Sequence, residues 1–350
     1  MKTKFYLLIL IIGGIISIIP FAFYWTDRGL ADWQVKLTQT KETKTEPVET
    51  TLLFGGDVML ARTVEQKMIK NADWTLPFLE IAEQFSQADI SFINLESPFL
   101  DGGNSTPVDS LVFRALPDSI EGLVLAGIDV VTLANNHFAN QGTAGMKQTM
   151  ELLNDRDIAY CGAGQNSQQS HQAVIIERNG LKFAYLGYAY PDSNLATATK
   201  MGVNNMNLEQ MTADVQEAAQ MADLVIVSMH AGAEYVYTPN QKQVDFARAA
   251  VSAGADLIIG HHPHVVQTYE QYQEGHIFYS LGNLVFDQDW SEPTTEGVVA
   301  KVILENQKIK TIEFLPIKTI DYHQATWGNE ETAQHVLDRL QLDSLVIIPN

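Results

Sequence analysis

The 350-residue sequence has little cysteine and little positive charge. Its one cysteine, Cys161, cannot form an internal disulfide, and no Cys-x-x-Cys pair offers thiolates to zinc or to a redox reaction. Lysine and arginine together number 22 against 42 aspartates and glutamates, which gives a formal net charge of -20 at pH 7. Such a surface repels a phosphate backbone, so nucleic acid is excluded as the main partner. Any metal ligands must be oxygens and imidazoles.

The longest uncharged apolar run lies at the N-terminus. Residues 5–25 follow Lys2 and Lys4, and the run is long enough to cross a hydrocarbon core of ~30 Å as a helix. A cleaved signal peptide has a shorter apolar region followed by small residues, whereas this run ends in aromatic ones. We therefore predict an uncleaved transmembrane signal-anchor. The positive-inside rule places residues 1–4 in the cytoplasm and the remaining chain outside it, as a single-pass protein of the cell membrane.

Residues 26–50 are polar and weakly patterned. They include "TKETKTEPVET", which is rich in Thr, Lys and Glu and has one proline, the composition of a solvated tether. We predict that a folded domain occupies residues 51–318. Residues 319–350 are predicted to form a C-terminal extension with a short helix.

Apolar runs that end in polar residues alternate with helical stretches along the predicted domain. The runs are residues 51–57, 88–96, 128–137, 222–230 and 255–264. Each is typical of a buried strand whose C-terminal end is exposed. Between them, stretches such as "GTAGMKQTMELLNDR" have apolar residues spaced three or four positions apart, as in a helix. The alternation predicts an α/β domain with largely parallel central strands, and the later β-rich segments predict antiparallel additions.

The predicted strands deliver polar side chains to their C-terminal ends. These side chains are Asp57, Glu96, Asn135, Asn136, His137, His230, His261, His262 and His264. Open α/β sheets bind ligands beyond the carboxyl ends of their strands, because loops from neighbouring strands converge there. Asp57 alone could cap a turn, and Asn136 alone could hold one. Five separate segments that each supply a ligand indicate a shared site instead.

The ligand types restrict the identity of the metal ion. Two carboxylates, an amide oxygen and several imidazoles without thiolate suit Mn²⁺, Fe²⁺ or Zn²⁺. They are too many for one tetrahedral ion, so we predict two divalent ions about 3.5–4 Å apart. Such a pair lowers the pKa of a bound water and stabilises both oxygens of a phosphoryl displacement. The predicted reaction is the metal-assisted hydrolysis of a phosphoester.

Seven motifs occur in the order seen in the CapA family. They are "GGDVMLAR", "FINLESPF", "LANNHFANQG", "CGAGQN", "MHAGAEY", "GHHPHVVQ" and "YSLGNLVFDQ". Residues 51–318 thereby resemble bacterial capsule or poly-γ-glutamate synthesis proteins, which are similar in fold to the calcineurin-like metallophosphoesterases. The resemblance implies a four-layer α-β-β-α sandwich, two sheets flanked by helices, with a dinuclear metal site at one edge.

The resemblance also implies roles for individual residues. The metal ligands would be Asp57, Glu96, Asn136, His230, His262 and His264, with Glu96 as the bridging carboxylate. His137 would face the leaving group and would form the catalytic pair with Asp57. Substrate contacts would come from Arg62, Arg114 and Asn135. For the two arginines, a surface ion pair in an acidic protein is the alternative.

His261 is the histidine that the resemblance leaves without a metal. In an extended segment alternate side chains share a face, so His262 and His264 are expected to converge across Pro263 while His261 points away. We therefore expect His261 either behind the ligands or exposed to solvent.

Three positions depart from the family's pattern. Met59 stands where the wider superfamily has a histidine, Asn140 where the family usually has aspartate, and Ala231 where it usually has tryptophan. These departures concern catalysis rather than the fold, and they keep two function classes open. The first is a membrane-tethered metallophosphoesterase that acts outside the cytoplasm on a phosphorylated envelope intermediate. The second is a non-catalytic subunit for assembly, anchoring or export in a capsule or poly-γ-glutamate synthesis complex.

A third class, a glycan or polyglutamate hydrolase, has less support. No nucleophile motif and no isolated carboxylate pair stands out in the sequence.

Overall fold

The structure is a computed structural model that describes residues 48–102, 106–190 and 194–349. The predicted signal-anchor at residues 5–25 lies outside the described residues, as do the cytoplasmic residues 1–4 and nearly all of the tether. Within the described ranges, none of the helices combines the length and the apolar character that a bilayer span requires.

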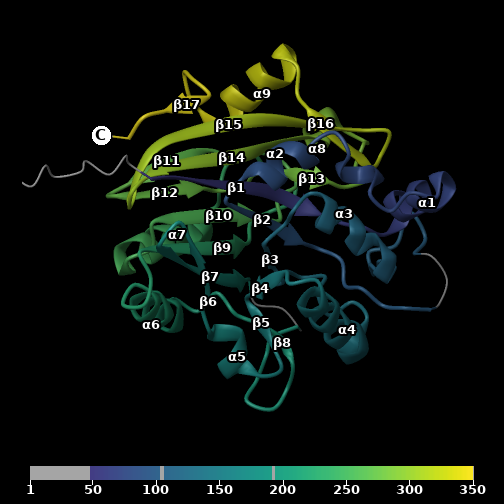
Figure 1. Cartoon of the computed structure of the whole chain (residues 1–350), viewed down its shortest axis with the longest axis horizontal. Coiled ribbons are helices and arrows are strands. Elements are labelled where there is room, and N and C mark those ends of the chain that lie inside the picture. The colour runs from purple at the N-terminus through teal and green to yellow at the C-terminus, as the bar shows by residue number, and fades with distance from the viewer. Residues whose placement is uncertain (1–47, 103–105, 191–193, 350) are drawn as a thin grey trace, which may run out of the picture. The chain divides into compact units, whose positions relative to one another are not determined.

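In the described part of the chain, the first sheet has nine strands and is built around β1. In order, its strands are β16 (Gln324–Trp327), β15 (Lys308–Ile320), β14 (Glu296–Glu305), β1 (Glu49–Val58), β2 (Ile90–Leu95), β3 (Val130–Thr132) and β4 (Ala159–Cys161), with β13 (Asn283–Val285) beside β1 and β17 (Val346–Ile347) beside β15. In Figure 1 these strands follow one another from β15 near the top, through β1, to β4 lower down. The strands β1 to β4 are parallel, whereas β14, β15 and β16 pair antiparallel.

The second sheet has six strands within the described residues. In order they are β11 (Tyr269–Tyr272), β12 (Gly275–Phe278), β10 (Leu257–His261), β9 (Leu224–His230), β7 (Leu181–Ala189) and β6 (Val174–Arg178). Its four central strands are parallel, and the two edge strands pair antiparallel with their neighbours. A small separate pair joins β5 (Ala163–Gly164) to β8 (Gly202–Val203). The predicted mixture of parallel centre and antiparallel additions is confirmed.

Along the chain, helices alternate with the strands of the two sheets. They are α1 (Arg62–Asn71), α2 (Ala82–Gln87), α3 (Ile120–Leu125), α4 (Gly142–Asp155), α5 (Ser167–His171), α6 (Leu208–Ala218), α7 (Gln241–Ala253), α8 (Glu292–Thr295) and α9 (Glu330–Leu340), with the 3-10 turns η1 (Leu76–Phe78) and η2 (Pro117–Ser119). Helix α7 begins with a capping box, in which Asn240 and Gln243 satisfy each other's backbone amides, and ends at Gly254 in a left-handed conformation.

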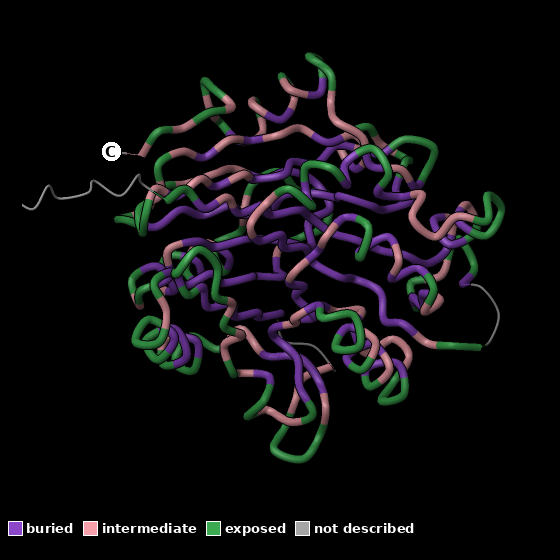
Figure 2. Tube along the Cα trace, in the orientation of Figure 1, coloured by how far each residue is buried: buried purple, intermediate pink, exposed green. Residues whose placement is uncertain are grey.

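Three apolar cores separate four layers. Helices α1 to α4 pack on the first sheet through residues such as Met68 and Phe85. The two sheets pack face to face, with the rings of Phe92 and Tyr185 stacked 5.7 Å apart between them. Helices α6 and α7 cover the second sheet with residues such as Phe246. The buried stretches therefore run through the middle of the molecule, as Figure 2 shows. The three cores give the layer order helix, sheet, sheet, helix.

The C-terminal residues belong to the same body as the preceding strands. The predicted domain end at residue 318 falls inside β15, and β16 and β17 extend the same sheet. Helix α9 is the short helix that the sequence predicts there, and its Val336 and Leu340 are buried in the core between the sheets. No domain boundary therefore separates residues 319–349 from the remainder of the fold.

Candidate metal centre

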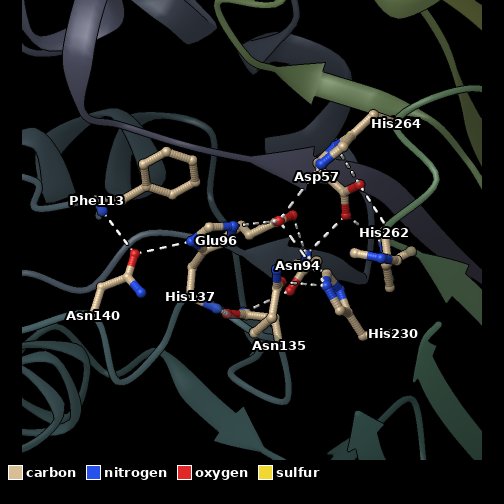
Figure 3. Close-up of polar contacts among 12 residues, drawn as sticks. Asp57, Asn94, Glu96, Phe113, Asn135, His137, Asn140, His230, His262 and His264 are labelled. Atoms are coloured by element: carbon tan, nitrogen blue, oxygen red, sulfur yellow. Dashed lines mark hydrogen bonds and ion pairs between the residues drawn. The ribbon is translucent and has the colours of Figure 1, made fainter. Parts of the chain in front are cut away.

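Five parallel strands end at one cluster of polar side chains. Strands β1, β2 and β3 of the first sheet and β9 and β10 of the second converge there. They supply Asp57, Asn94, Glu96, Asn135, Asn136, His137, His230, His261, His262 and His264. Figure 3 shows most of these side chains turned toward one another. The predicted convergence at the carboxyl ends of the strands is present.

A close approach of two strands aims Asp57 into the cluster. A Cβ on Gly56 would lie 2.0 Å from the carbonyl oxygen of Gly282, so only glycine fits there. Asp57 N donates a hydrogen bond to the same oxygen at 3.0 Å. The register between β1 and β2 shifts between Phe54 and Asp57. An irregularity of this kind directs a side chain out of the ladder, here the carboxylate of Asp57.

Two sets of three buried side chains could each hold a metal ion. Within the described residues, ligand atoms of Asp57, Glu96 and His264 lie within 4.8 Å of one another, and so do those of Glu96, His230 and His262. Both sets contain Glu96, which is the position that a bridging carboxylate would occupy. The Oδ1 atom of Asn136 lies 2.9 Å from His230 Nε2, on the side of the second set. The donor atoms are those that Mn²⁺, Fe²⁺ or Zn²⁺ accept.

The surroundings of Glu96 favour a bound cation beside its carboxylate. Its Oε1 is buried and has no hydrogen-bond partner among the described residues. The same oxygen lies 3.8 Å from Nε2 of His137, 3.8 Å from Nε2 of His264 and 4.0 Å from Nε2 of His230. Burial, reinforced by the charge of Asp57, raises the pKa of Glu96 well above its usual range. A buried carboxylate oxygen without a donor is costly, and a bound metal ion would remove that cost.

Asp57 is in the opposite situation. Burial opposes its ionisation, but the neighbouring imidazoles of His261 and His264 outweigh burial and hold the pKa of Asp57 well below its usual range. Nδ1 of His261 lies 3.2 Å from Oδ1, and Nδ1 of His264 lies 3.3 Å from Oδ2. Asn94 Nδ2 also donates to Oδ1 at 2.8 Å. Asp57 is therefore a fixed anion at one end of the cluster.

The histidine segment after β10 is not extended. His262 has a φ of 96 and His264 a φ of 57, both in the left-handed region. The predicted alternation of faces is therefore the wrong explanation, although His262 and His264 do converge on the cluster. His261, the last residue of β10, is fully buried, so of the two predicted placements the structure has the one behind the ligands and not the exposed one. It lies behind the ligands, in contact with Asp57.

Asn94 is a central residue that the sequence interpretation missed. Its Nδ2 donates to Asp57 Oδ1 at 2.8 Å and to Glu96 Oε2 at 3.0 Å, and thus joins the two carboxylates. The available signal was its spacing, because residues two apart on a strand share a face and Asn94 precedes Glu96 by two. It was hidden inside an otherwise apolar run. Asn94 fixes both carboxylates in one arrangement.

Asn135 supports Asn94 through hydrogen bonds. It is fully buried, and its Nδ2 donates to Asn94 Oδ1 at 3.0 Å and to the carbonyl oxygen of Leu95 at 2.8 Å. Its Oδ1 accepts a hydrogen bond from His137 N at 3.1 Å. The amide of Asn135 is thus used within the fold, and its predicted substrate contact stays a prediction.

His137 presents one ring nitrogen to the cluster. Its Nδ1 lies 2.9 Å from Asn140 Oδ1, which also accepts from Phe113 N at 2.7 Å, and its ring stacks on Phe113 at 4.0 Å. Burial lowers the pKa of His137 to about 4, so the imidazole is neutral at pH 7. With the Nδ1 proton directed at Asn140, Nε2 is left as an acceptor 3.8 Å from Glu96 Oε1.

His264 is oriented by a second residue that the sequence interpretation missed. Asn283 Oδ1 lies 3.0 Å from His264 Nδ1, and Asn283 Nδ2 donates to Gln288 Oε1 and to the carbonyl oxygen of Thr294. Burial opposes protonation of His264, but the charges of Glu96 and Asp57 raise its pKa to about 9. Nε2 faces Glu96, as a ligand of the first set requires. Asn283 lies within a motif quoted from the sequence, and its spacing alone gave no indication of this contact.

Both predicted anion-binding arginines form ion pairs inside the protein. Arg62 is buried and pairs with Asp287, and its guanidinium carbon lies 4.8 Å from the ring centroid of Phe113. Arg114 Nη2 lies 3.7 Å from Glu65 Oε1, and its Nη1 donates to two backbone carbonyl oxygens. The ion-pair alternative is therefore what the structure contains, in a buried form rather than at the surface.

Met59 leaves the first set of ligands without an additional imidazole. Its side chain is fully buried, and its Sδ accepts a hydrogen bond from Ala61 N at 3.0 Å. Thioether sulfur is a poor ligand for the hard and borderline ions that the cluster suits. The Asp57 set therefore offers three protein ligands.

Two facing sheets with a buried carboxylate–histidine cluster at their shared edge define an α/β protein with a candidate metal centre. The family described as "Bacterial capsule synthesis protein PGA_cap" matches residues 51–288, and the chain belongs to this family.

Two curated relatives agree with this assignment. The chain is 31% identical over 316 residues to "Capsule biosynthesis protein CapA" of Bacillus anthracis, a match that covers 88% of this chain and 75% of that protein. It is 32% identical over 318 residues to "PGA biosynthesis protein CapA" of Bacillus subtilis (strain 168), covering 89% of this chain and 80% of that one. The predicted family is confirmed.

A solved structure shares the fold. A hypothetical protein from Thermus thermophilus superposes with a TM-score of 0.51 at 14% sequence identity, over 77% of this chain and 99% of that one. At this identity the likeness concerns the arrangement of sheets and helices alone.

Proposed function

We propose that this protein is a membrane-anchored, extracytoplasmic component of capsule or poly-γ-glutamate biosynthesis whose centre hydrolyses a phosphoester. Membership of the capsule synthesis family supports the biological process. The observation that carries the chemistry is Glu96, which belongs to both ligand sets and has a buried oxygen without a hydrogen-bond partner in the described structure.

Two divalent ions, Mn²⁺, Fe²⁺ or Zn²⁺, would be held by this chain's own side chains. Asp57, Glu96 and His264 would hold one, and Glu96, His230 and His262 with the amide oxygen of Asn136 would hold the other. When bound, such a pair acidifies water and stabilises charge on phosphoryl oxygens.

Hydrolysis also needs a group that carries a proton. A water oxygen bonds to phosphorus, the ester P–O bond breaks, and the departing alkoxide takes up the proton that the water gives up. His137 Nε2 faces the cluster, and Asn140 and Phe113 fix its ring. His137 is the residue that we assign to this proton.

The test is a metal-dependent hydrolysis assay on the full-length protein in detergent. We expect turnover of phosphomonoesters or diesters with Mn²⁺, Fe²⁺ or Zn²⁺, and a loss of about 100-fold or more in Glu96→Gln, because both ligand sets lose their shared carboxylate. Bound metal without turnover of any ester in the panel would contradict the catalytic proposal.

That outcome would favour a second function, a non-catalytic subunit for assembly, anchoring or export of the polymer. The observation behind it is Met59, which leaves the Asp57 set with three protein ligands. A subunit of this kind would bind other members of a synthesis complex. It would be recognised by co-purification of those members with both the wild type and Glu96→Gln.

The proposed location has a separate test. If residues 5–25 are an anchor, protease added to intact, wall-stripped cells should degrade residues 27–350. Full protection of the chain would contradict an extracytoplasmic domain.

A further inference from the structure

A cavity of about 610 Å³ opens beside the candidate metal centre. Tyr190 directly follows β7, Ala231 directly follows β9, Leu208 begins α6, and Phe246 lies in α7; all four line it. The cavity is thus built at the carboxyl ends of two strands of the second sheet, the same edge that carries His230.

The cavity adjoins one of the two ligand sets. Ala231 is the next residue after His230, and Tyr190 N donates to the carbonyl oxygen of His230 at 3.1 Å. The ring of Tyr190 lies 5.1 Å from the ring of His262, centroid to centroid. A ligand bound at the set of Glu96, His230 and His262 would therefore have this cavity next to it.

The chemistry of the walls favours an apolar organic group. Aromatic and aliphatic surface comes from Tyr190, Met206, Leu208, Ala231 and Phe246, and the volume is that of a small-molecule pocket. Lys242 and Asp245 also line the cavity and add one charge of each sign, so the charged part of the wall has no net charge. Asn240 also lines the cavity, but its side chain already accepts from the first amides of α7. That helix end is therefore satisfied and does not offer the cavity a second phosphate site.

We propose that the cavity binds the organic group of the phosphoester, an aromatic or branched aliphatic alcohol portion, and that Ala231 sets its size. The inference rests on the proposed phosphoesterase function and deepens it. Ala231 is 4% exposed, and its small side chain leaves open a space that a larger one would enter. Residue 231 is then a specificity-determining position rather than a catalytic one.

The experiment compares benzyl phosphate with methyl phosphate on the metal-loaded, full-length protein. The two alcohols are similarly poor leaving groups, so the ratio of kcat/KM reports binding of the ring. We expect a ratio of about ten or more in the wild type, typical of apolar groups entering a pocket. Ala231→Trp should lower the ratio to about one, because the indole would occupy the part of the cavity next to His230.

Two further variants make the result decisive. Leu208 is 49% exposed, so Leu208→Trp reduces the cavity from its rim with little risk to folding, and it should lower the ratio even if Ala231→Trp does not fold. Ala233→Trp is the matched control, because it lies on the same loop, is exposed and does not line the cavity. It should keep the wild-type ratio.

Binding separates failure of this inference from failure of the proposed function. If the wild type hydrolyses no ester, calorimetry with benzylphosphonate and methylphosphonate replaces the kinetic ratio and is expected to show the same tenfold preference. An unchanged preference in folded Leu208→Trp, by either measurement, would overturn the assignment of the cavity. So would a wild type without preference for the ring.

Discussion

Three groups of histidine and carboxylate side chains that could hold a metal ion occur among the described residues, and their surroundings differ. Two of them share Glu96 and make up the candidate metal centre; the third is Glu292 and Glu296 with His335, between α8, β14 and α9. Arg339 Nη2 lies 2.7 Å from Glu296 Oε2, and Lys318 Nζ lies 3.3 Å from Glu296 Oε1. Among the ion pairs of the described residues, no lysine or arginine reaches Glu96.

The two surroundings shift the pKa of Glu96 and the pKa of Glu296 in opposite directions. Burial raises the pKa of Glu96 well above its usual range. Burial also opposes the ionisation of Glu296, but His335, Arg339 and Lys318 outweigh it and lower the pKa of Glu296. Similar residue types therefore form either an ion network or a candidate metal site, and the presence of protein cations decides which.

The largest expected effect is on bound metal. Glu96→Gln should remove both ions, because both ligand sets depend on this carboxylate, whereas Glu296→Gln should keep them. We expect a loss of metal affinity well beyond the roughly 10–100-fold cost of altering an outer residue. Elemental analysis of the purified variants measures it. Equal metal content in the two variants would contradict the comparison.

The second prediction ranks the three adjacent histidines. His262→Ala and His264→Ala should each remove bound metal. His261→Ala should keep most of it, with an affinity about tenfold lower, because His261 contacts Asp57 and lies outside both ligand sets. Metal titration of each variant measures the order. If all three variants retain metal equally, the metal centre itself must be abandoned.

The third prediction concerns folding stability. Glu296→Gln should lower the free energy of unfolding by about 1–3 kcal/mol, since it removes the charge of a fully buried carboxylate that pairs with Arg339 and Lys318. Glu292→Gln is the matched control: it removes an exposed carboxylate that also pairs with Lys318, and should cost less than about 0.5 kcal/mol. Urea unfolding of metal-free protein at pH 7 decides. Similar losses in both variants would mean that burial of Glu296 contributes nothing.

The smallest effect is the pH dependence of that difference. The pKa of Glu296 is lowered on folding from an ordinary value of 4.5, so its ionised form stabilises the native state above that pH. The stability gap between wild type and Glu296→Gln should be complete at pH 7 and should shrink as the pH falls below 4.5. Unfolding measured at pH 7 and again near pH 3 tests the sign. A gap that widens in acid would contradict it.

The sequence predicted the position of the candidate metal centre where polar residues end strands. Apolar runs followed by His230 or by His262 and His264 identified both the strands and the shared edge. Prediction from the sequence failed where contacts depend on distant residues or on backbone conformation. The pairing of Arg62 with Asp287 joins residues far apart in the chain, and the left-handed φ of His262 has no signature in residue spacing.

Asn94 illustrates a different difficulty. A polar residue inside an apolar strand is normally expected near the edge of a sheet. Asn94 is instead fully buried, and it is accommodated there because it donates hydrogen bonds to two carboxylates. Its role follows only once the partner strand β1 is placed beside β2. The fold class was therefore readable from local patterns, whereas the supporting hydrogen bonds required the sheet.

The pairing of β1 with β14 has a consequence for the order of folding. Glu49 pairs with Glu305, and Phe54 with Ala300, so β1 lies against a strand that is far from it in the chain and is synthesised much later. Contacts between such distant segments close large loops and slow folding. Until β14 is available, β1 lacks its antiparallel neighbour and the first sheet is incomplete. Completion of the first sheet should therefore be a late step of folding, after both of these distant segments are present.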